Sequence, residues 1–283
     1  MSTTFYPKID GTTTAVADLM TNLSGRGHDV QLLTRRFKNT PKVERWNGLR
    51  VSRIGPAKKS SISRIILFMN QIVAGGLIIR RSRTDLIHTN SFISLYAALV
   101  LGRLFRIPTV MTFNGSQRIW RPEARWQSNA DLSITLPLES YAMKQADAIF
   151  VQSQELKSLI ERLYGVKGRM VKVIPHPVDL DIFKPRSDRK NETSNIILFV
   201  GTLGRIHGAD LFVRSIDPVL KEFSNAKFII VGTGPLRGFL GNLITTMNVR
   251  ASVEFLGQIS DRQELSKLYQ RCSVVVIPVR YPS

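Results

Sequence analysis

The sequence is short of cysteine and of acidic residues, and both shortages limit what the protein can be. Cys272 is the only cysteine, so an internal disulfide is excluded and we expect a reducing compartment, the cytoplasm. Asp and Glu number 21 against 40 Lys and Arg, a formal net charge of +19. This excess favours an anionic partner, namely a phosphate, a nucleic acid or an acidic membrane surface. Residues 1–184 carry 27 of the basic and 13 of the acidic residues, so the first half is expected to meet any large anionic surface.

Long apolar runs are also missing. The longest run, residues 65–79, covers 15 residues and is interrupted by Asn70 and Gln71, whereas a spanning helix needs roughly 20. Residues 1–7 have neither a basic start nor an apolar stretch, so we expect no secretory signal. Basic residues flank the run on both sides: Lys58, Lys59, Arg64, Arg80, Arg81 and Arg83. Two interpretations stay open, a buried amphipathic helix with solvated ends or a helix lying on an anionic bilayer.

An alternation of strands and helices fills the rest of the sequence. The hydrophobic fraction of 43% and the charged fraction of 22% are those of a globular protein. In the first half the patterns predict helices at 12–23, 92–104, 136–145 and 154–165, and strands at 29–34, 85–88, 108–113, 148–151 and 170–175. In the second half they predict helices at 209–223, 236–247 and 260–270, the last opened by a Ser260–Gln263 capping box, and buried strands at 196–200, 227–231, 253–256 and 273–279.

A proline-bounded polar stretch separates the two halves. It contains Pro177, Pro185 and the polar run 186–194. We therefore predict an α/β protein with a Rossmann-like domain at 1–178, a linker at 179–194 and a second, incomplete Rossmann-like domain at 195–283.

Three glycine-bearing loops each come before a predicted helix, and two of them directly follow a predicted strand. They are Gly11-Thr12, the stretch 201–208 with Gly201, Thr202, Arg205 and His207, and Gly232-Thr233-Gly234-Pro235. Glycine lets backbone N–H groups approach a phosphate at a helix start, and open α/β sheets bind ligands at this edge. Each loop can also be an ordinary turn, and Thr12 can simply cap its helix.

His88 and Asn114 end two further predicted strands, so both are candidates for contacting a ligand. A purely structural role for His88 remains an equal alternative. The spacing of His, Cys and carboxylate residues predicts no metal site, and no nucleotide-binding Walker loop or serine-nucleophile motif is present.

The ordered set of loops resembles the GT-B glycosyltransferases, specifically the retaining enzymes of glycosyltransferase family 4. The resemblance covers essentially the whole chain and rests on the stretches 5–11, 23–30, 147–149, 173–185, 199–210, 231–235 and 253–257. It implies two Rossmann-like domains facing across a cleft, with the acceptor on the N-terminal domain and the nucleotide-sugar donor on the C-terminal domain. It also implies transfer with retention of configuration, and neither a metal nor a cofactor beyond the donor itself.

The chain departs from the family pattern at four places. Gly11-Thr12 stands where the family commonly has two glycines, and Asn114 where it commonly has a histidine. Thr202 and His207 stand where the family has an arginine and a lysine on the diphosphate, with Arg205 as a possible substitute. The family's pair of glutamates would follow the stretch 277–283, so we expect a fragment, truncated at both ends, that lacks this pair.

The sequence thus predicts a glycosyltransferase acting on a glycan or lipid-linked acceptor, located in the cytoplasm or peripherally on the inner face of a membrane. The alternative is a non-catalytic subunit that binds a nucleotide-sugar or a partner and is completed by another chain. Nucleic acid is not expected as a partner, because no recognition motif or series of stacking aromatics is present.

Overall fold

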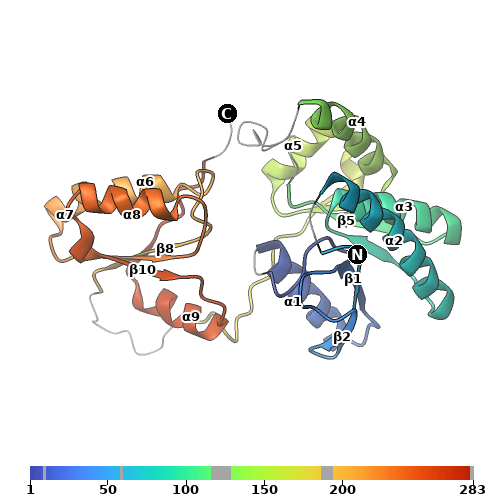
Figure 1. The fold of residues 1–283 in the computed structure, drawn as a ribbon, viewed down its shortest axis with the longest axis horizontal. Helices are drawn as coiled ribbons and strands as arrows, with labels where there is room; N and C mark the ends of the chain where they lie inside the picture. The colour runs from blue at the N-terminus through green and yellow to red at the C-terminus, as the bar shows by residue number, and fades with distance from the viewer. Residues whose placement is uncertain (9–10, 58–59, 116–128, 186–193, 281–283) are drawn as a thin grey trace. The chain divides into compact units, whose positions relative to one another are not determined.

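The computed structural model describes residues 1–8, 11–57, 60–115, 129–185 and 194–280. These residues form two compact units, Met1–Pro177 and Val178–Ser283 (Figure 1). The boundary falls where the predicted linker begins, and residues 186–193 of that linker lie outside the described part. The described residues 182–184 pack on the second unit, since Ser266 Oγ donates to the carbonyl of Ile182 and Gln270 Nε2 to that of Lys184.

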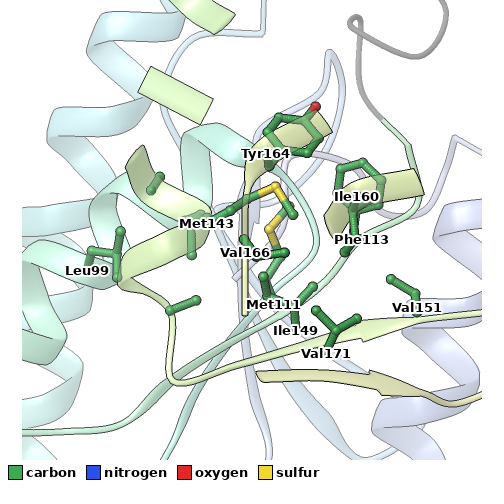
Figure 2. Close-up of a cluster of buried hydrophobic side chains, with 13 residues drawn as sticks. Leu99, Met111, Phe113, Met143, Ile149, Val151, Ile160, Tyr164, Val166 and Val171 are labelled. Carbon is green, nitrogen blue, oxygen red and sulfur yellow. The ribbon is translucent and has the colours of Figure 1, made fainter. Parts of the chain in front are cut away.

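A parallel sheet forms the centre of the first unit, with the strand order β4-β5-β6-β7. Its strands are β4 (Ile87–Thr89), β5 (Thr109–Thr112), β6 (Ala148–Val151) and β7 (Val171–Val173). The helices α3 (Phe92–Phe105), α4 (Asn129–Gln145) and α5 (Gln154–Tyr164) bury a cluster of side chains against it that includes Met111, Phe113, Met143 and Tyr164 (Figure 2). The predicted caps of α5 are confirmed: Ser153 accepts from the N–H of Leu156, and Gly165 ends the helix in the left-handed conformation.

A smaller mixed sheet in the same unit includes two strands that the sequence patterns did not predict. Strand β1 (Gln31–Arg35) pairs in parallel with β3 (Leu49–Ile54), which pairs antiparallel with β2 (Val43–Trp46). The turn between β2 and β3 is Asn47-Gly48, with both residues at positive φ. Asn-Gly is a strong hairpin signal, so the dipeptide itself predicts this turn. Helix α1 (Gly11–Gly25) packs on this sheet.

The second unit is built on one parallel sheet with the order β10-β9-β8-β11. The strands are β8 (Ile196–Val200), β9 (Lys227–Val231), β10 (Val253–Gly257) and β11 (Val274–Val275). One face packs on α6 (Ala209–Arg214), α7 (Ile216–Glu222) and α8 (Arg237–Thr246), and the other on α9 (Arg262–Arg271). Neighbouring residues on β8 point to opposite faces of the sheet: Phe199 is buried among side chains on the α6–α8 side, and Leu198 is buried on the α9 side. The prediction that β8 is buried on both faces is therefore confirmed. Two short 3-10 turns, Gly168–Met170 and Arg250–Ser252, precede β7 and β10.

Three predictions for the second unit are wrong. The helix predicted over 209–223 is interrupted at Ser215, and Pro218, which has no N–H to donate, lies in the first turn of the helix that follows. Asp261, not Ser260, caps α9 and accepts from the N–H of Gln263. The strand predicted over 273–279 pairs only at 274–275, with both residues exposed, because β11 is the edge strand of the described sheet.

The interpretation of residues 65–79 as a buried amphipathic helix is also wrong. These residues lie in α2 (Ser61–Arg81), and Ile62, Ile65, Met69 and Val73 on that helix are each more than half exposed.

Candidate functional site

Two glycine loops meet at the carboxyl ends of β8 and β9 in the second unit. We call residues 201–208 the first glycine loop and residues 232–235 the second. Val200 pairs in register with Val231, so the two loops leave adjacent parallel strands side by side. The N–H of Leu203 donates to the carbonyl of Thr233 at 3.0 Å, and the N–H of Leu236 donates back to Leu203 at 2.9 Å. The backbone therefore holds the two loops as one structure at the edge where α/β sheets bind ligands.

Close backbone packing explains three of the glycines. A Cβ on Gly232, whose φ is +137°, would lie 1.9 Å from the carbonyl oxygen of Gly201. A Cβ on Gly234 would lie 2.5 Å from the carbonyl oxygen of Leu203, and one on Gly208 would lie 1.8 Å from that of Pro278. These glycines are needed for the loops to pack, whether or not a ligand is bound.

Gly201 differs from those three glycines. A Cβ there would meet only the ring of Phe199, at the ordinary contact distance of 3.5 Å, and the residue is not at positive φ. Packing therefore does not require glycine at this position, and the predicted role of Gly201 in donor binding stays a prediction. The predicted donor-binding side chains Thr202, Arg205 and His207 are exposed on the first loop, and Pro235 is exposed on the second.

Arg280 joins the first glycine loop to the segment after β11. The backbone N–H of Arg280 donates to the carbonyl of Ile206 at 2.8 Å. Its guanidinium donates to the carbonyl of Arg205 and to the carboxylate of Asp210. Those hydrogen bonds from Arg280 hold the pKa of the Asp210 carboxyl below its usual value, although burial opposes the shift. Sequence reasoning missed this pair, which joins residues 70 positions apart.

Asn114 follows the end of β5 at the carboxyl edge of the sheet in the first unit, as predicted, whereas His88, predicted to end its strand, is the middle residue of β4, one position before the strand's end. His88 Nε2 lies 2.7 Å from Thr112 Oγ1, and burial, followed by the positive N-terminus, lowers the pKa of His88 to about 4. The ring is therefore neutral at pH 7. Asn114 Oδ1 accepts a hydrogen bond from Gln152 Nε2 at 3.1 Å, so Gln152, which the sequence patterns did not single out, joins the edge from β6.

Asn90 is a further polar residue at this edge that sequence reasoning did not select. Both its amide atoms, Nδ2 and Oδ1, are buried and have no hydrogen-bond partner among the described residues. Buried amides are nearly always paired, so a site for a ligand or water is indicated next to Asn90.

Gly11 and Thr12 open α1, and the predicted helix start is confirmed. Gly11 is exposed, and a Cβ added to it would meet nothing within 4 Å. The first unit contains Gly11, His88 and Asn114, and the second contains the two glycine loops. That these residues line one cleft together therefore stays a prediction. Within the described residues no group of three or more His, Cys, Asp or Glu could hold a metal ion.

Two family models together match residues 9–282. The model described as Glycosyltransferase Family 4 matches residues 9–182, and the model described as Glycosyl transferases group 1 matches residues 182–282. Their junction lies close to the boundary between the two units.

Curated relatives cover nearly all of the chain. The chain is 27% identical over 275 residues to an uncharacterised glycosyltransferase of Methanocaldococcus jannaschii. This match covers 93% of the chain and 69% of the relative. It is 23% identical over 296 residues to the alpha-monoglucosyldiacylglycerol synthase of Acholeplasma laidlawii, covering 96% and 72% of the two chains.

Solved structures share the fold. Sucrose-phosphate synthase from Thermosynechococcus elongatus superposes with a TM-score of 0.80 at 22% identity, over 97% of this chain and 71% of the other. Anabaena HepE in complex with UDP and glucose superposes with a TM-score of 0.72 at 16% identity, over 100% and 75%. The predicted fold class, α/β with Rossmann-like domains of the GT-B type, is confirmed. The chain belongs to the GT-B glycosyltransferases, with a family 4 N-terminal part and a group 1 C-terminal part.

Proposed function

We propose that the chain transfers a sugar from a nucleotide-diphosphate-sugar donor to a hydroxyl group of a glycan or lipid-linked acceptor, with retention of configuration. In this reaction the bond between the anomeric carbon and the diphosphate oxygen breaks, and the acceptor oxygen bonds to the same carbon. The acceptor hydroxyl releases its proton to solution, and the nucleoside diphosphate leaves with the electron pair of the broken bond, so it carries one more negative charge than in the donor.

The observation that carries the proposal is the locked pair of glycine loops at the ends of β8 and β9. The diphosphate would lie against Gly201, Thr202, Gly232, Gly234 and Pro235, with Arg205 as the cation that stabilises its growing charge. His207 would assist as a hydrogen-bond donor. HepE, which shares the fold, is known in complex with UDP and glucose, and this agrees with a nucleotide-sugar donor.

The acceptor side is assigned to the first unit. Gly11 and Thr12 would approach the donor from the start of α1, and His88 and Asn114 are the candidates next to the reacting sugar. The neutral ring of His88 can donate or accept a hydrogen bond at pH 7, but it adds no charge there. The name of the Acholeplasma relative, a synthase of a glucosylated diacylglycerol, favours a lipid-linked acceptor. We accordingly place the protein in the cytoplasm, next to the inner face of a membrane.

The first experiment measures donor binding and turnover separately. Isothermal titration of the purified chain with UDP, GDP and ADP tests for a nucleotide site, and Arg205→Ala should weaken binding of the preferred nucleotide about tenfold. Release of the nucleoside diphosphate in the presence of lipid and glycan acceptors tests transfer, and proton NMR of the product reports the anomeric configuration. Binding without any turnover would favour the non-catalytic subunit instead. An absence of binding to all three nucleotides would overturn the proposal.

A further inference from the structure

Helix α2 carries six apolar side chains on the face that points to solvent. We call this set the outer stripe; its members and exposed fractions are Ile62 (69%), Ile65 (64%), Ile66 (41%), Met69 (54%), Val73 (61%) and Leu77 (49%). They recur every three or four residues, so they share one side of the helix. A helix on the surface of a water-soluble domain normally shows the reverse, and a continuous apolar patch marks a surface that binds something.

The opposite face of α2 is fixed in place by its contacts: Leu67 is buried, and Ile72 and Ile79 pack on the cluster that includes Leu101. Gln71 is buried and donates from Nε2 to Ser94 Oγ on α3 at 2.9 Å. Gly75 is packed so closely on α3 that a Cβ would lie 2.6 Å from Leu101 Cδ1. Rotating the helix to bury the outer stripe would put branched side chains where glycine fits and would break the Gln71–Ser94 hydrogen bond. The exposure of the stripe is therefore a property of the packed fold.

Within the part of the chain that the structure describes, α2 is the one helix long and apolar enough to cross a membrane. An 18-residue window within Ile62–Arg81 has a mean hydropathy of 1.8, and 22% of that window is buried. Its contacts with α3 keep it attached to the first unit, so it can lie along a membrane surface without leaving the fold.

Charge distinguishes a bilayer from a second copy of the chain as the partner. Residues 45–84 contain nine Lys and Arg and no Asp or Glu. Arg80, Arg81 and Arg83 are exposed at the end of α2, and Asp85, 3.6 Å from Arg83, is the nearest acidic residue after them. Two copies meeting through α2 would bring the same cations together without carboxylates from 45–84 to pair them. A bilayer with acidic phospholipids supplies acyl chains for the stripe and phosphates for the arginines.

We infer that α2 binds the surface of a bilayer rich in acidic phospholipid, with the outer stripe at the boundary of the acyl chains and Arg80, Arg81 and Arg83 among the headgroups. This inference deepens the membrane location given under the proposed function by naming the surface that binds, but it requires neither a donor nor sugar transfer.

The first test is co-sedimentation of the full chain with vesicles. We expect binding to phosphatidylcholine vesicles containing about 30% phosphatidylglycerol to be at least tenfold tighter than to phosphatidylcholine alone, and to weaken with salt. The combined variant Ile65→Gln, Met69→Gln, Val73→Gln should lose at least about tenfold in binding. The matched control is Phe223→Gln with Phe239→Gln, which removes exposed apolar side chains from the second unit and should leave binding unchanged.

A second test reports which residues enter the bilayer. In a Cys272→Ser background, which removes the one buried thiol, an environment-sensitive dye is attached at Met69→Cys or at Phe223→Cys. The dye at 69 should shift to the blue with acidic vesicles and the dye at 223 should not. Replacing Arg80, Arg81 and Arg83 with Gln should reduce binding to acidic vesicles while leaving the weak binding to neutral ones.

Three results would overturn the inference. The first is a chain that stays in the supernatant with both kinds of vesicle, and the second is binding that ignores the acidic lipid. The third is a dimer in analytical ultracentrifugation that the triple-Gln variant dissociates, since the outer stripe would then belong to a second copy. Nucleotide binding by the triple-Gln variant should match the wild type, so failure here is separable from failure of the proposed function.

Discussion

The guanidinium of Arg280 donates two hydrogen bonds to the carboxylate of Asp210, from Nη1 at 2.6 Å and from Nη2 at 2.8 Å. A two-pronged contact of this kind fixes direction as well as distance. Because Asp210 lies in the first turn of α6 and Arg280 also binds the carbonyls of Arg205 and Ile206, the pair fixes the shape of the first glycine loop. Arg280 is thus a positioning residue for the proposed donor site.

Replacing Arg280 with Gln should therefore weaken donor binding more than it slows the chemical step. We expect the KM for the donor to rise about tenfold with a smaller change in kcat, because the loop that holds the diphosphate is loosened. Initial-rate kinetics on the variant check this. Lys221→Gln is the matched control, since it removes an exposed ion pair of the same unit, Lys221–Asp217 at 2.8 Å, and it should leave the KM unchanged. An Arg280→Gln variant that loses stability but keeps its KM would contradict the positioning role.

The same ion pair predicts a pH dependence of stability. The pKa of Asp210 is lowered in the folded protein, chiefly by hydrogen bonds from Arg280. A carboxyl with a lowered pKa stabilises the fold above its unfolded value of about 3.9, and this contribution is lost as the pH falls through the folded pKa. The Arg280 side chain is 37% exposed, so after solvent screening we expect a difference of about 1 kcal/mol between wild type and Arg280→Gln near pH 6. Urea denaturation should show this difference shrinking below about pH 4; a difference independent of pH would contradict it.

Replacing Gly232 or Gly201 with alanine should affect different properties: stability at 232 and donor affinity at 201. In Gly232→Ala the new Cβ meets a backbone oxygen in a conformation that disfavours side chains, so we expect a loss of more than about 2 kcal/mol in the free energy of unfolding. In Gly201→Ala the Cβ has room, so thermal stability should be kept while donor affinity falls. Gly238→Ala, with nothing within 4 Å of its Cβ, is the control and should keep both. Calorimetry and nucleotide titration measure the two effects, and equal destabilisation at 201 and 232 would contradict the distinction.

Asn90 offers a separate test of the edge in the first unit. Since its buried amide has no partner among the described residues, Asn90→Ala should leave the melting temperature unchanged or raise it. If the amide serves a bound acceptor or sugar, kcat/KM should fall about tenfold in the same variant. A lower melting temperature with unchanged kcat/KM would instead assign Asn90 a structural role.

The acid response of His88 has a predictable sign. Burial lowers its pKa to about 4, while the unfolded chain takes up the proton near pH 6.5. The contribution of His88 to the free energy of unfolding is therefore fully present above about pH 6.5, and it is lost as the pH falls toward 4. Denaturation of His88→Gln should show a weaker loss of stability over this range than the wild type, and an identical loss would contradict the assignment.

Local sequence patterns determined most of the elements and the edges that carry the candidate site. Apolar runs of five residues predict β8 and β9, and the caps Ser153 and Gly165 predict α5, because these signals act within a few residues. The β2–β3 hairpin is encoded equally locally, by the turn dipeptide Asn47-Gly48, but the periodicity of apolar residues does not indicate this turn. The interruption of the predicted helix 209–223 at Ser215 is also encoded locally, by Pro218 a few residues further along.

Only the tertiary structure decided how these elements face one another. The contact of Arg280 with Asp210 joins positions 70 residues apart, and no periodicity in the sequence reports such a distance. Helix α2 is a second example. A stripe of apolar residues in the sequence predicts that a helix has an apolar side, but it does not predict which side packs inward. Buried Leu67, together with Gly75 and Gln71 against α3, makes that choice. Close packing admits one orientation of the helix, and the outer stripe is then left exposed.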